Sequence, residues 1–397
     1  MLRHLLKLTW QRKTRNLMLS LEILLAFAIV FGIAAFGLRY LQLYRMPIGF
    51  DGRDTWSVQL RTDGAEEAIP ADVYATLRRG LMELPEVREV GFASYSPYRN
   101  ANWTTTWKSP VTGAKVRTNI MQASDGVAAA LGIPLVRGRW FSSVDEGAAV
   151  EPVVLNRRAA AALFPGVDAL GRQLTDTEDG ATRTRRVVGI VDEFRHKGPL
   201  MAPDNFVMTR FAPLARKDRV TTVLLRVAPG TPRAFEARLN ERLKLLRNDW
   251  TYEIAPLPAK RAAIMKEQLV PLAVVAIVGA FVLAMVAFGL FGVLWQNTTQ
   301  RIPEIGLRRA LGARAADIYR QIVAEQLLLS SLAMVVGLLL LAQLPLTGAL
   351  GASLDWTVFG AAALVSMATI YLLSLLCSLY PGWRASRLDP VDALHYE

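Results

Sequence analysis

Four long apolar runs constrain the fold of this chain more than any other feature. A helix needs about 20 apolar residues to cross a bilayer, and each run reaches that length. The composition agrees, since 52% of the residues are hydrophobic and only 20% are charged. These values indicate a membrane protein that also carries a water-exposed part. The predicted transmembrane helices are residues 17–38, 269–295, 322–344 and 357–380.

The short segments beside these runs predict which side of the membrane each lies on, because basic residues mark cytoplasmic flanks. Segment 1–16 has five basic residues and no acidic one, and segment 296–321 has five arginines against two acidic residues. The link 345–356 has no basic residue and is expected outside. Both termini, including the tail 381–397, are therefore predicted in the cytoplasm, and residues 39–268 outside the cytoplasmic membrane.

The exported segment 39–268 is long enough for one or two compact domains with cores of their own. Alternating apolar residues predict strands, and apolar residues at helical spacing predict helices. Their order favours an α+β domain built from β-α-β pieces. The expected strands are 56–60, 87–95, 152–155, 186–191, 220–227 and 251–254, and the expected helices cover 73–84, 159–163 and 232–246. Residues 39–46 and 259–268 are predicted to extend the neighbouring membrane helices as stalks.

The basic segment 296–321, between the second and third runs, is predicted to form a cytoplasmic amphipathic helix. From Arg301 to Gln326, apolar residues recur at helical spacing with arginines between them. Spacing alone leaves two interpretations open: a helix at the membrane surface that meets a partner, or a basic loop that only fixes topology. Glu325, near the start of the third run, is expected to reach water or an arginine such as Arg320.

Two further patterns predict contacts at and within the membrane. In segment 1–16, leucines and Trp10 share one helical face, which favours a helix lying in the inner leaflet. In the second run, small residues recur every four positions and allow another helix to approach closely. Lipid-facing filler is the alternative, since small residues are common in membrane helices. This small-residue stripe consists of Ala276, Ala280, Ala284 and Gly292.

The sequence offers little for enzymatic chemistry. It has no Gly-Lys dipeptide, so these residues contain no phosphate-binding loop of the G-x-x-x-x-G-K-[ST] type and are not expected to hydrolyse ATP. Its single cysteine, Cys377, lies within the fourth run, and its three histidines are far apart. No catalytic, cofactor or metal site is therefore assigned. The net charge of +12 is spread along the chain, which favours contact with membrane lipid and not nucleic acid.

The run EIGLRRALGA, from Glu304 to Ala313, resembles a cytoplasmic signature that precedes a membrane helix in the MacB/FtsX family of ABC transporter permeases. The closing run YPGWRASRLDPVDALHYE resembles the family's Y-P-A-x-x-A-x-x-x-x-P-x-x-A-L-R-x-E, with Gly382 in place of alanine and His395 in place of arginine. The stretches PVVLNRRAAAALFP and RRVVGIVDEF are more loosely similar to the family's periplasmic core domain.

The resemblance implies a set of partners. In this family two permeases pair, and each receives a cytoplasmic ATPase that binds ATP and Mg; the second permease here is either a copy of this chain or a sister chain. The small-residue stripe is then the expected permease contact. The residues implied in ATPase coupling are Glu304, Ile305, Gly306, Leu307, Arg308, Arg309, Ala310, Leu311, Gly312 and Ala313. The matched closing-motif residues are Pro381, Arg384, Pro390, Ala393 and Leu394.

Two functions of different classes follow from the resemblance. The first is the permease subunit of a transporter in the bacterial inner membrane, in which ATPase closure tilts the stalks and drives export or extraction of an amphiphile, peptide or lipoprotein. A periplasmic adaptor and an outer-membrane duct would accompany export. The second is an FtsX-like regulator of a periplasmic hydrolase, which moves no substrate. The size of segment 39–268 favours the first function, and the sequence does not identify the substrate.

Overall fold

A computed structural model describes residues 13–61, 69–100, 102–178, 181–211, 220–347 and 355–386. The chain divides into two compact units. The helical unit comprises residues 1–42 and 269–397, and the sheet unit comprises residues 43–268. Most of the predicted N-terminal helix 1–16 lies outside the described residues, as does part of the predicted link 345–356.

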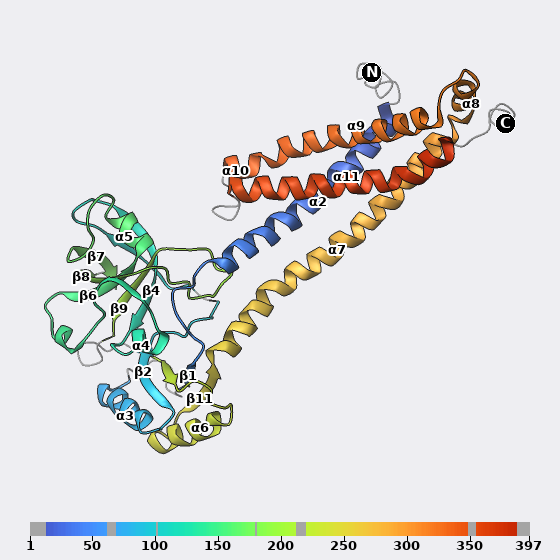
Figure 1. Cartoon of the computed structure of the whole chain (residues 1–397). Coiled ribbons are helices and arrows are strands. Elements are labelled where there is room, and N and C mark those ends of the chain that lie inside the picture. Colours follow the sequence, from blue (N-terminus) through green and yellow to red (C-terminus); the bar gives the residue numbers. More distant parts are fainter. Residues whose placement is uncertain are drawn as a thin grey trace. The chain divides into compact units, whose positions relative to one another are not determined.

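Within the described residues, four helices are long and apolar enough to cross a membrane. Three of them, α2, α7 and α11, cover their predicted runs and extend past both ends (Figure 1). The fourth, α9, begins before its run and ends at Leu341, and the short α10 follows it. The extension is greatest in α7, which begins at Leu257 and continues through Pro271 without a break. The long helices are α2 (Lys13–Arg45), α7 (Leu257–Thr299), α9 (Ala315–Leu341) and α11 (Trp356–Ser386), and the short ones are α8 (Ile302–Ala310) and α10 (Gln343–Thr347).

Residues of α2, α7, α9 and α11 form the core of the helical unit. Ile23 and Phe27 of α2 are fully buried against Leu290 of α7 and Met334 of α9. The few polar groups in this core are paired, as the Ser330 and Ser374 hydroxyls show at 2.8 Å. Such pairing is needed because a lone polar group in an apolar medium is costly.

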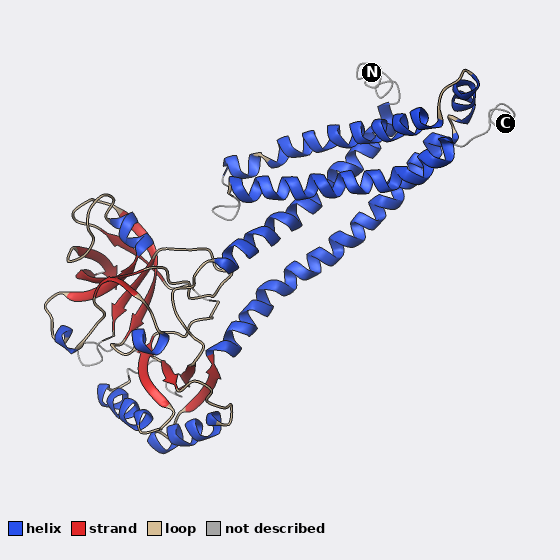
Figure 2. Cartoon of the chain, viewed as in Figure 1, coloured by secondary structure: helices blue, strands red, loops and turns tan. Residues whose placement is uncertain are grey.

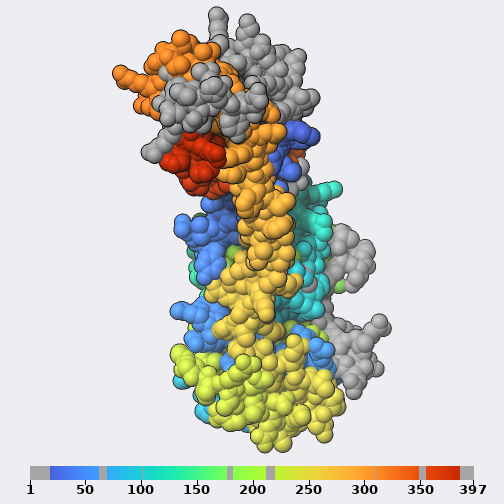
Figure 3. Space-filling model, turned by 90° about the vertical axis from the view of Figure 1, so that its right-hand side faces the viewer, coloured from blue at the N-terminus to red at the C-terminus, as the bar shows by residue number. Residues whose placement is uncertain are grey.

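The apolar surface of the helical unit is distributed unevenly. Only 11% of the most apolar stretch of α7 is buried, against 39% of that of α11. Ile277, Phe281 and Phe288 of α7 are each more than two-thirds exposed. Figure 3 shows the yellow-to-orange side chains of α7 on the surface that faces the viewer. A face of this kind is stable only against lipid or another apolar surface.

Part of the sheet unit has the order β-α-β-β-α-β. Its strands pair antiparallel in the order β11-β1-β10-β2, and helices α3 and α6 pack on one face. This arrangement is the ferredoxin-like split β-α-β fold. The elements are β1 (Thr55–Arg61), α3 (Ala71–Met82), β2 (Val87–Ala93), β10 (Thr222–Val227), α6 (Phe235–Leu246) and β11 (Thr251–Pro256).

The residues between β2 and β10 form a second part of the same sheet. The strand order β4-β3-β7-β8-β6-β9 closes into a ring, because β9 also pairs in parallel with β4 (Figure 2). The strands are β3 (Thr104–Lys108), β4 (Lys115–Ala123), β5 (Leu135–Gly138), β6 (Glu151–Asn156), β7 (Gln173–Glu178), β8 (Ala181–Val191) and β9 (Phe206–Arg210). The helices are α4 (Val127–Leu131), α5 (Arg157–Leu163) and the 3-10 turn η1 (Ser143–Asp145).

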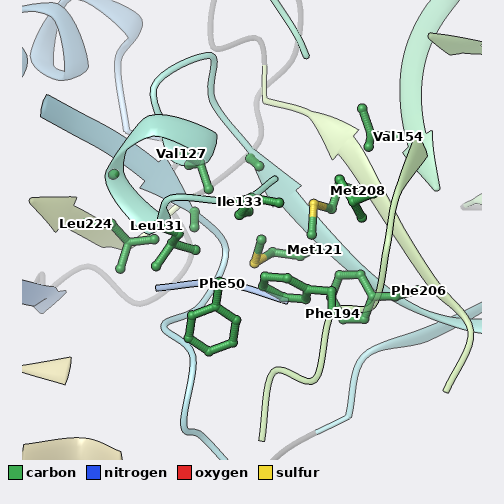
Figure 4. Close-up of a cluster of buried hydrophobic side chains, with 14 of the residues drawn as sticks. Phe50, Met121, Val127, Leu131, Ile133, Val154, Phe194, Phe206, Met208 and Leu224 are labelled. Atoms are coloured by element: carbon green, nitrogen blue, oxygen red, sulfur yellow. The ribbon is translucent and has the colours of Figure 1, made fainter. Parts of the chain in front are cut away.

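Three apolar clusters hold the sheet unit together. One lies under α3 and α6, and another lies between α5 and the ring. The third joins both parts, with the tilted rings of Phe50, Phe194 and Phe206 packed beside Met121 and Met208 (Figure 4). The fold class is therefore confirmed: membrane helices with a large α+β domain inserted between the first and second.

One buried arginine holds the last turn of α2, which belongs to the sheet unit. The Arg195 guanidinium has no exposed surface and donates hydrogen bonds to the carbonyl oxygens of Leu43 and Met46, each at 3.0 Å. It also donates to Met201 O at 2.8 Å and to Pro199 O. The carbonyls at a helix C-terminus lack partners within the helix, so Arg195 satisfies them and fixes the last turn of α2.

Candidate functional site

Proline and glycine set the limits of α8. Pro303 lies in the first turn, where a missing N–H costs nothing. Gly312 adopts a left-handed φ of 95°, and the Ala313 N–H donates to Arg308 O at 3.0 Å. This is a Schellman-type helix end, which favours glycine. The prediction of one helix across 296–321 is therefore wrong, because Gly312 ends α8 and the chain restarts as α9 at Ala315.

The inward face of α8 is apolar. Ile305 is 6% exposed and packs against Ile318, which is 5% exposed, and against Ile322 of α9. Gly306, the next residue, is also buried. These contacts hold α8 against the start of α9.

A network of polar contacts also holds α8 in place. Arg301, just before α8, donates to Glu325 of α9 at 2.6 Å, and Glu325 accepts a second bond from Gln321 at 2.9 Å. Arg308 donates to Gln321 and to Glu304, both at 2.7 Å. Glu325 is 23% exposed and Arg301 22%, so this pair is screened less than a surface pair. The network links the end of α7, α8 and the start of α9.

Two leucines are exposed on α8 and just past its last residue. Leu307 is 53% exposed and Leu311 is 81% exposed. Ala310 is exposed on the same helix. Among the described residues, neither leucine belongs to an apolar core cluster of this unit.

The described part of the closing motif packs at the same end of the helical unit. Tyr380 stacks on Trp295 of α7, with ring centroids 5.7 Å apart and an interplanar angle of 9°. The Arg384 guanidinium lies 4.6 Å from the centre of the Trp295 ring, a cation–π contact. A Cβ on Gly382 would lie 3.0 Å from the Tyr319 ring of α9, which explains why glycine replaces the usual alanine.

The structure thus brings together two motifs that are far apart in sequence. Residues 304–313 and 380–384 meet around the start of α9, through Ile318 on one side and Tyr319 on the other. The small-residue stripe does not join them: Ala280, Ala284 and Gly292 are exposed on α7, and Gly292 has nothing within 4 Å of its Cβ position. Pro390, Ala393, Leu394 and the side chain of Arg309 lie outside what the structure describes.

Sequence reasoning missed the network partners. Glu325 pairs with Arg301 and not with Arg320, and neither Gln321 nor Tyr319 was assigned a part in the site. The spacing of Gln321 and Glu325, four residues apart on one helix face, was the available signal. Within the described ranges, no three His, Cys, Asp or Glu side chains gather as ligands for a metal ion would.

Comparison with known proteins agrees with this architecture. The MacB-like periplasmic core domain model matches residues 19–242, and the FtsX-like permease C-terminal model matches residues 276–390. The macrolide export ATP-binding/permease protein MacB of Agrobacterium fabrum is 26% identical over 97% of this chain and 59% of its own length. The probable syringafactin export ATP-binding/permease protein SyfD of Pseudomonas syringae is 23% identical over 96% of this chain and 56% of its own length.

A solved structure of the periplasmic region of MacB from Actinobacillus actinomycetemcomitans covers 56% of this chain and 98% of its own, at 14% identity and a TM-score of 0.40. The family models, which together match most of the chain, show the family. The chain belongs to the MacB/FtsX family of ABC transporter permeases and is a multi-pass membrane protein. It corresponds to the permease portion and spans about three-fifths of the Agrobacterium relative.

Proposed function

We propose that this chain is a permease subunit that receives a cytoplasmic ATPase on α8 and passes the force of ATP binding to the sheet unit. The exposure of Leu307 and Leu311 on an anchored helix carries this proposal. Helices that dock on a partner do so through a few apolar anchors in a groove. ATP and Mg would be bound by the ATPase, since these 397 residues contain no phosphate loop.

Force could pass along α7 and α2. The 43 residues of α7 form one helix, about 65 Å long at 1.5 Å per residue. Its first residue follows β11 directly, without a loop that would absorb displacement. Arg195 fixes the last turn of α2 within the sheet unit. Tilting of the membrane helices would therefore move the sheet unit, and we propose that this movement exports or extracts a periplasmic or membrane amphiphile, peptide or lipoprotein.

The relatives support this direction by their names, which describe export of macrolides and of syringafactin by proteins with an ATP-binding part. The uncovered face of α7, with its small-residue stripe, suits a second permease. A periplasmic adaptor and an outer-membrane duct would complete an export route.

Co-purification tests the proposal. The tagged full chain should retain an ATP-hydrolysing subunit after mild solubilisation, and hydrolysis should be absent from the chain purified alone. Identification of all retained chains also shows whether the second permease is a copy or a sister chain. Steady ATP hydrolysis by the isolated chain, after removal of contaminating ATPases, would contradict the proposal that a separate subunit hydrolyses ATP.

An FtsX-like regulator is the second candidate, because the C-terminal match is to an FtsX-like permease model. A regulator would retain a periplasmic hydrolase or its activator in the same co-purification, and deletion of the gene would leave export unchanged. The large sheet unit favours transport, since a signal relay needs no domain of this size.

Topology is tested separately. Cysteine at Val144, which is 84% exposed in the sheet unit, should react with an impermeant thiol reagent in intact spheroplasts. Cysteine at Ala316, exposed at the start of α9, should react only after permeabilisation. The native Cys377 is buried and gives the background. The opposite labelling pattern would reverse the proposed orientation.

A further inference from the structure

The face of the split β-α-β sheet opposite its helices is partly uncovered. Along β1, side chains alternate: Trp56, Val58 and Leu60 pack under α3 and α6, so Ser57, Gln59 and Arg61 lie on the other face. The first turns of α7 and the loop after β2 border this second face. Between them lies a pocket of about 590 Å³, within the size range of small-molecule sites.

The charges that line this pocket do not cancel. Arg61 pairs with Glu253 at 2.7 Å, and Glu267 accepts a hydrogen bond from Asn100 at 3.2 Å. Lys260 has only the Ser57 hydroxyl, at 3.1 Å, as a polar partner. Arg99 lies 5.2 Å from the centre of the Trp103 ring. Among the described residues, no carboxylate lies within ion-pair distance of Lys260 or Arg99.

Apolar side chains complete the wall. Pro97, Tyr98 and Ile264 line the pocket, and Ile264 is 4% exposed. Tyr98 has a φ of 64°, the only positive value among the non-glycine residues that the structure describes. Its N–H donates to His196 O at 2.6 Å, and Gly198 leaves space for its ring. A bulky residue held in this region is strained, and such strain gathers at binding sites.

We propose that this pocket binds an amphiphile with a single anionic headgroup, a carboxylate, sulfate or phosphate. Lys260 and Arg99 supply the two cations for the headgroup, and Pro97, Tyr98 and Ile264 receive the apolar part. A cationic amphiphile is disfavoured here, because Glu253 is paired with Arg61, and the single negative charge of Glu267 does not offset the two positive charges of Lys260 and Arg99. That the bound amphiphile is cargo rests on the proposed function, whereas binding itself does not.

Equilibrium dialysis tests the site on the full chain in nanodiscs of zwitterionic lipid, without ATPase and with empty discs subtracted. The probe is 4-phenylbutyl phosphate, compared with 4-phenylbutylamine and 4-phenylbutanol, which share its apolar part. Saturable binding of the phosphate at one site is expected, with at least tenfold weaker binding of the other two.

Variants identify the residues. Lys260→Gln should weaken binding of the phosphate probe about tenfold, the scale of a lost charged hydrogen bond, and Lys260→Arg should restore most of it. Arg99→Gln, at an exposed position, should also weaken it. Lys266→Gln is the matched control on the same helix, since Lys266 is exposed and does not line the pocket. Unchanged melting temperatures show that the variants fold.

The proposal is overturned if the amine binds as tightly as the phosphate, or if Lys260→Gln and Arg99→Gln both bind like the wild type. Repeating the dialysis in discs with anionic lipid identifies the natural source of the headgroup. If the anionic lipid competes strongly with the phosphate probe, the natural ligand is a lipid headgroup. If binding of the probe is undiminished, the natural ligand is a free amphiphile. This binding assay contains no ATPase and does not depend on transport. If the chain proves not to transport, the proposed function is wrong, but the measured binding of the probe remains valid.

Discussion

The two units of this chain bury polar groups in opposite ways. The sheet unit encloses whole charges: Arg185 and Arg195 are at most 1% exposed, and Arg185 lies between Asp176 and Glu151 in the ring. Among the described residues of the helical unit, the buried polar groups are mainly serine hydroxyls, such as Ser330 with Ser374 at 2.8 Å, and the one buried charge is Arg39 of α2, which contacts Gln42 at 2.9 Å. An unpaired charge is costly in an apolar medium. In a membrane-spanning unit the surrounding lipid cannot solvate such a charge, so charged residues are rare there.

This difference predicts where single substitutions act most strongly. In the sheet unit a buried arginine donates hydrogen bonds to several acceptors, so its replacement should lower the free energy of unfolding strongly. In the helical unit the packing depends on close steric contact, so the sensitive positions are small residues. On the uncovered faces, substitution should leave the fold intact and affect only partners.

The largest effect is expected at Arg195. Arg195→Met fills similar space but leaves several buried carbonyls without a donor, each costing about 1–3 kcal/mol. The sheet unit should lose at least about 3 kcal/mol of unfolding free energy, measured by denaturation followed by tryptophan fluorescence. Arg53→Met is the control, since its side chain is 84% exposed. Equal effects of the two substitutions would contradict the contrast between buried and surface cations.

A smaller effect is expected at Gly337 in α9. A Cβ there would lie 2.7 Å from the buried ring of Phe27, so Gly337→Ala should force α2 and α9 apart and cost about 1–3 kcal/mol. Thermal inactivation of the purified chain in detergent measures this. Gly360→Ala on α11 meets nothing within 4 Å and should leave the midpoint unchanged. If Gly337→Ala and Gly360→Ala have the same inactivation midpoint, close steric contact between helices does not determine the stability of this unit.

The pH dependence of the sheet unit should include Asp51. A hydrogen bond from the Arg53 side chain lowers the pKa of Asp51 from 3.8 to about 2. A lowered folded pKa stabilises the protein fully above about pH 4, and the contribution is lost as the pH falls towards 2. Melting temperatures measured across this range should therefore fall less in Asp51→Asn and Arg53→Gln than in the wild type. Parallel curves for all three proteins would exclude this pair as a source of acid sensitivity.

The smallest effect on the fold is expected at Gly292. Nothing lies within 4 Å of its Cβ position, so Gly292→Leu should leave the melting temperature unchanged. If the small-residue stripe packs against a second permease, the mass of the solubilised complex should fall, because leucine prevents close approach. Val335→Leu on α9, where Val335 is 54% exposed, is the matched control. Pairing that survives Gly292→Leu would place the permease contact elsewhere.

The two units also differ in how far the sequence predicts them. Membrane helices follow from a local property, the length of an apolar run, so all four were found. In the sheet unit, β1, β2, β6, β8, β10 and β11 were expected from alternation, while β3 (TTTWK) and β7 (QLTDTE) are too polar to be recognised. Closure of the ring depends on Asn119 meeting Phe206, a pairing that no local pattern encodes.

The candidate site was predicted in position but not in orientation. EIGLRRALGA indicated a coupling segment, and the structure separates it into buried Ile305 and exposed Leu307 and Leu311. Gly312, one of the residues implied in ATPase coupling, ends the helix. Arg308, another of them, is engaged within the chain by Glu304 and Gln321. A single sequence cannot show these contacts, because they depend on how α8 folds back on α9.

ATPase capture by α8 variants tests the central claim most directly. Reversing Arg308 would also break contacts within the chain, so Leu307→Asp with Leu311→Asp is the sharper change. We expect this double variant to insert and melt like the wild type but to retain at least about tenfold less ATPase, the scale of one lost apolar anchor. Val144→Asp, equally exposed but in the sheet unit, should retain the full amount. Full ATPase capture and full ATP-dependent activity by the folded double variant would contradict the account.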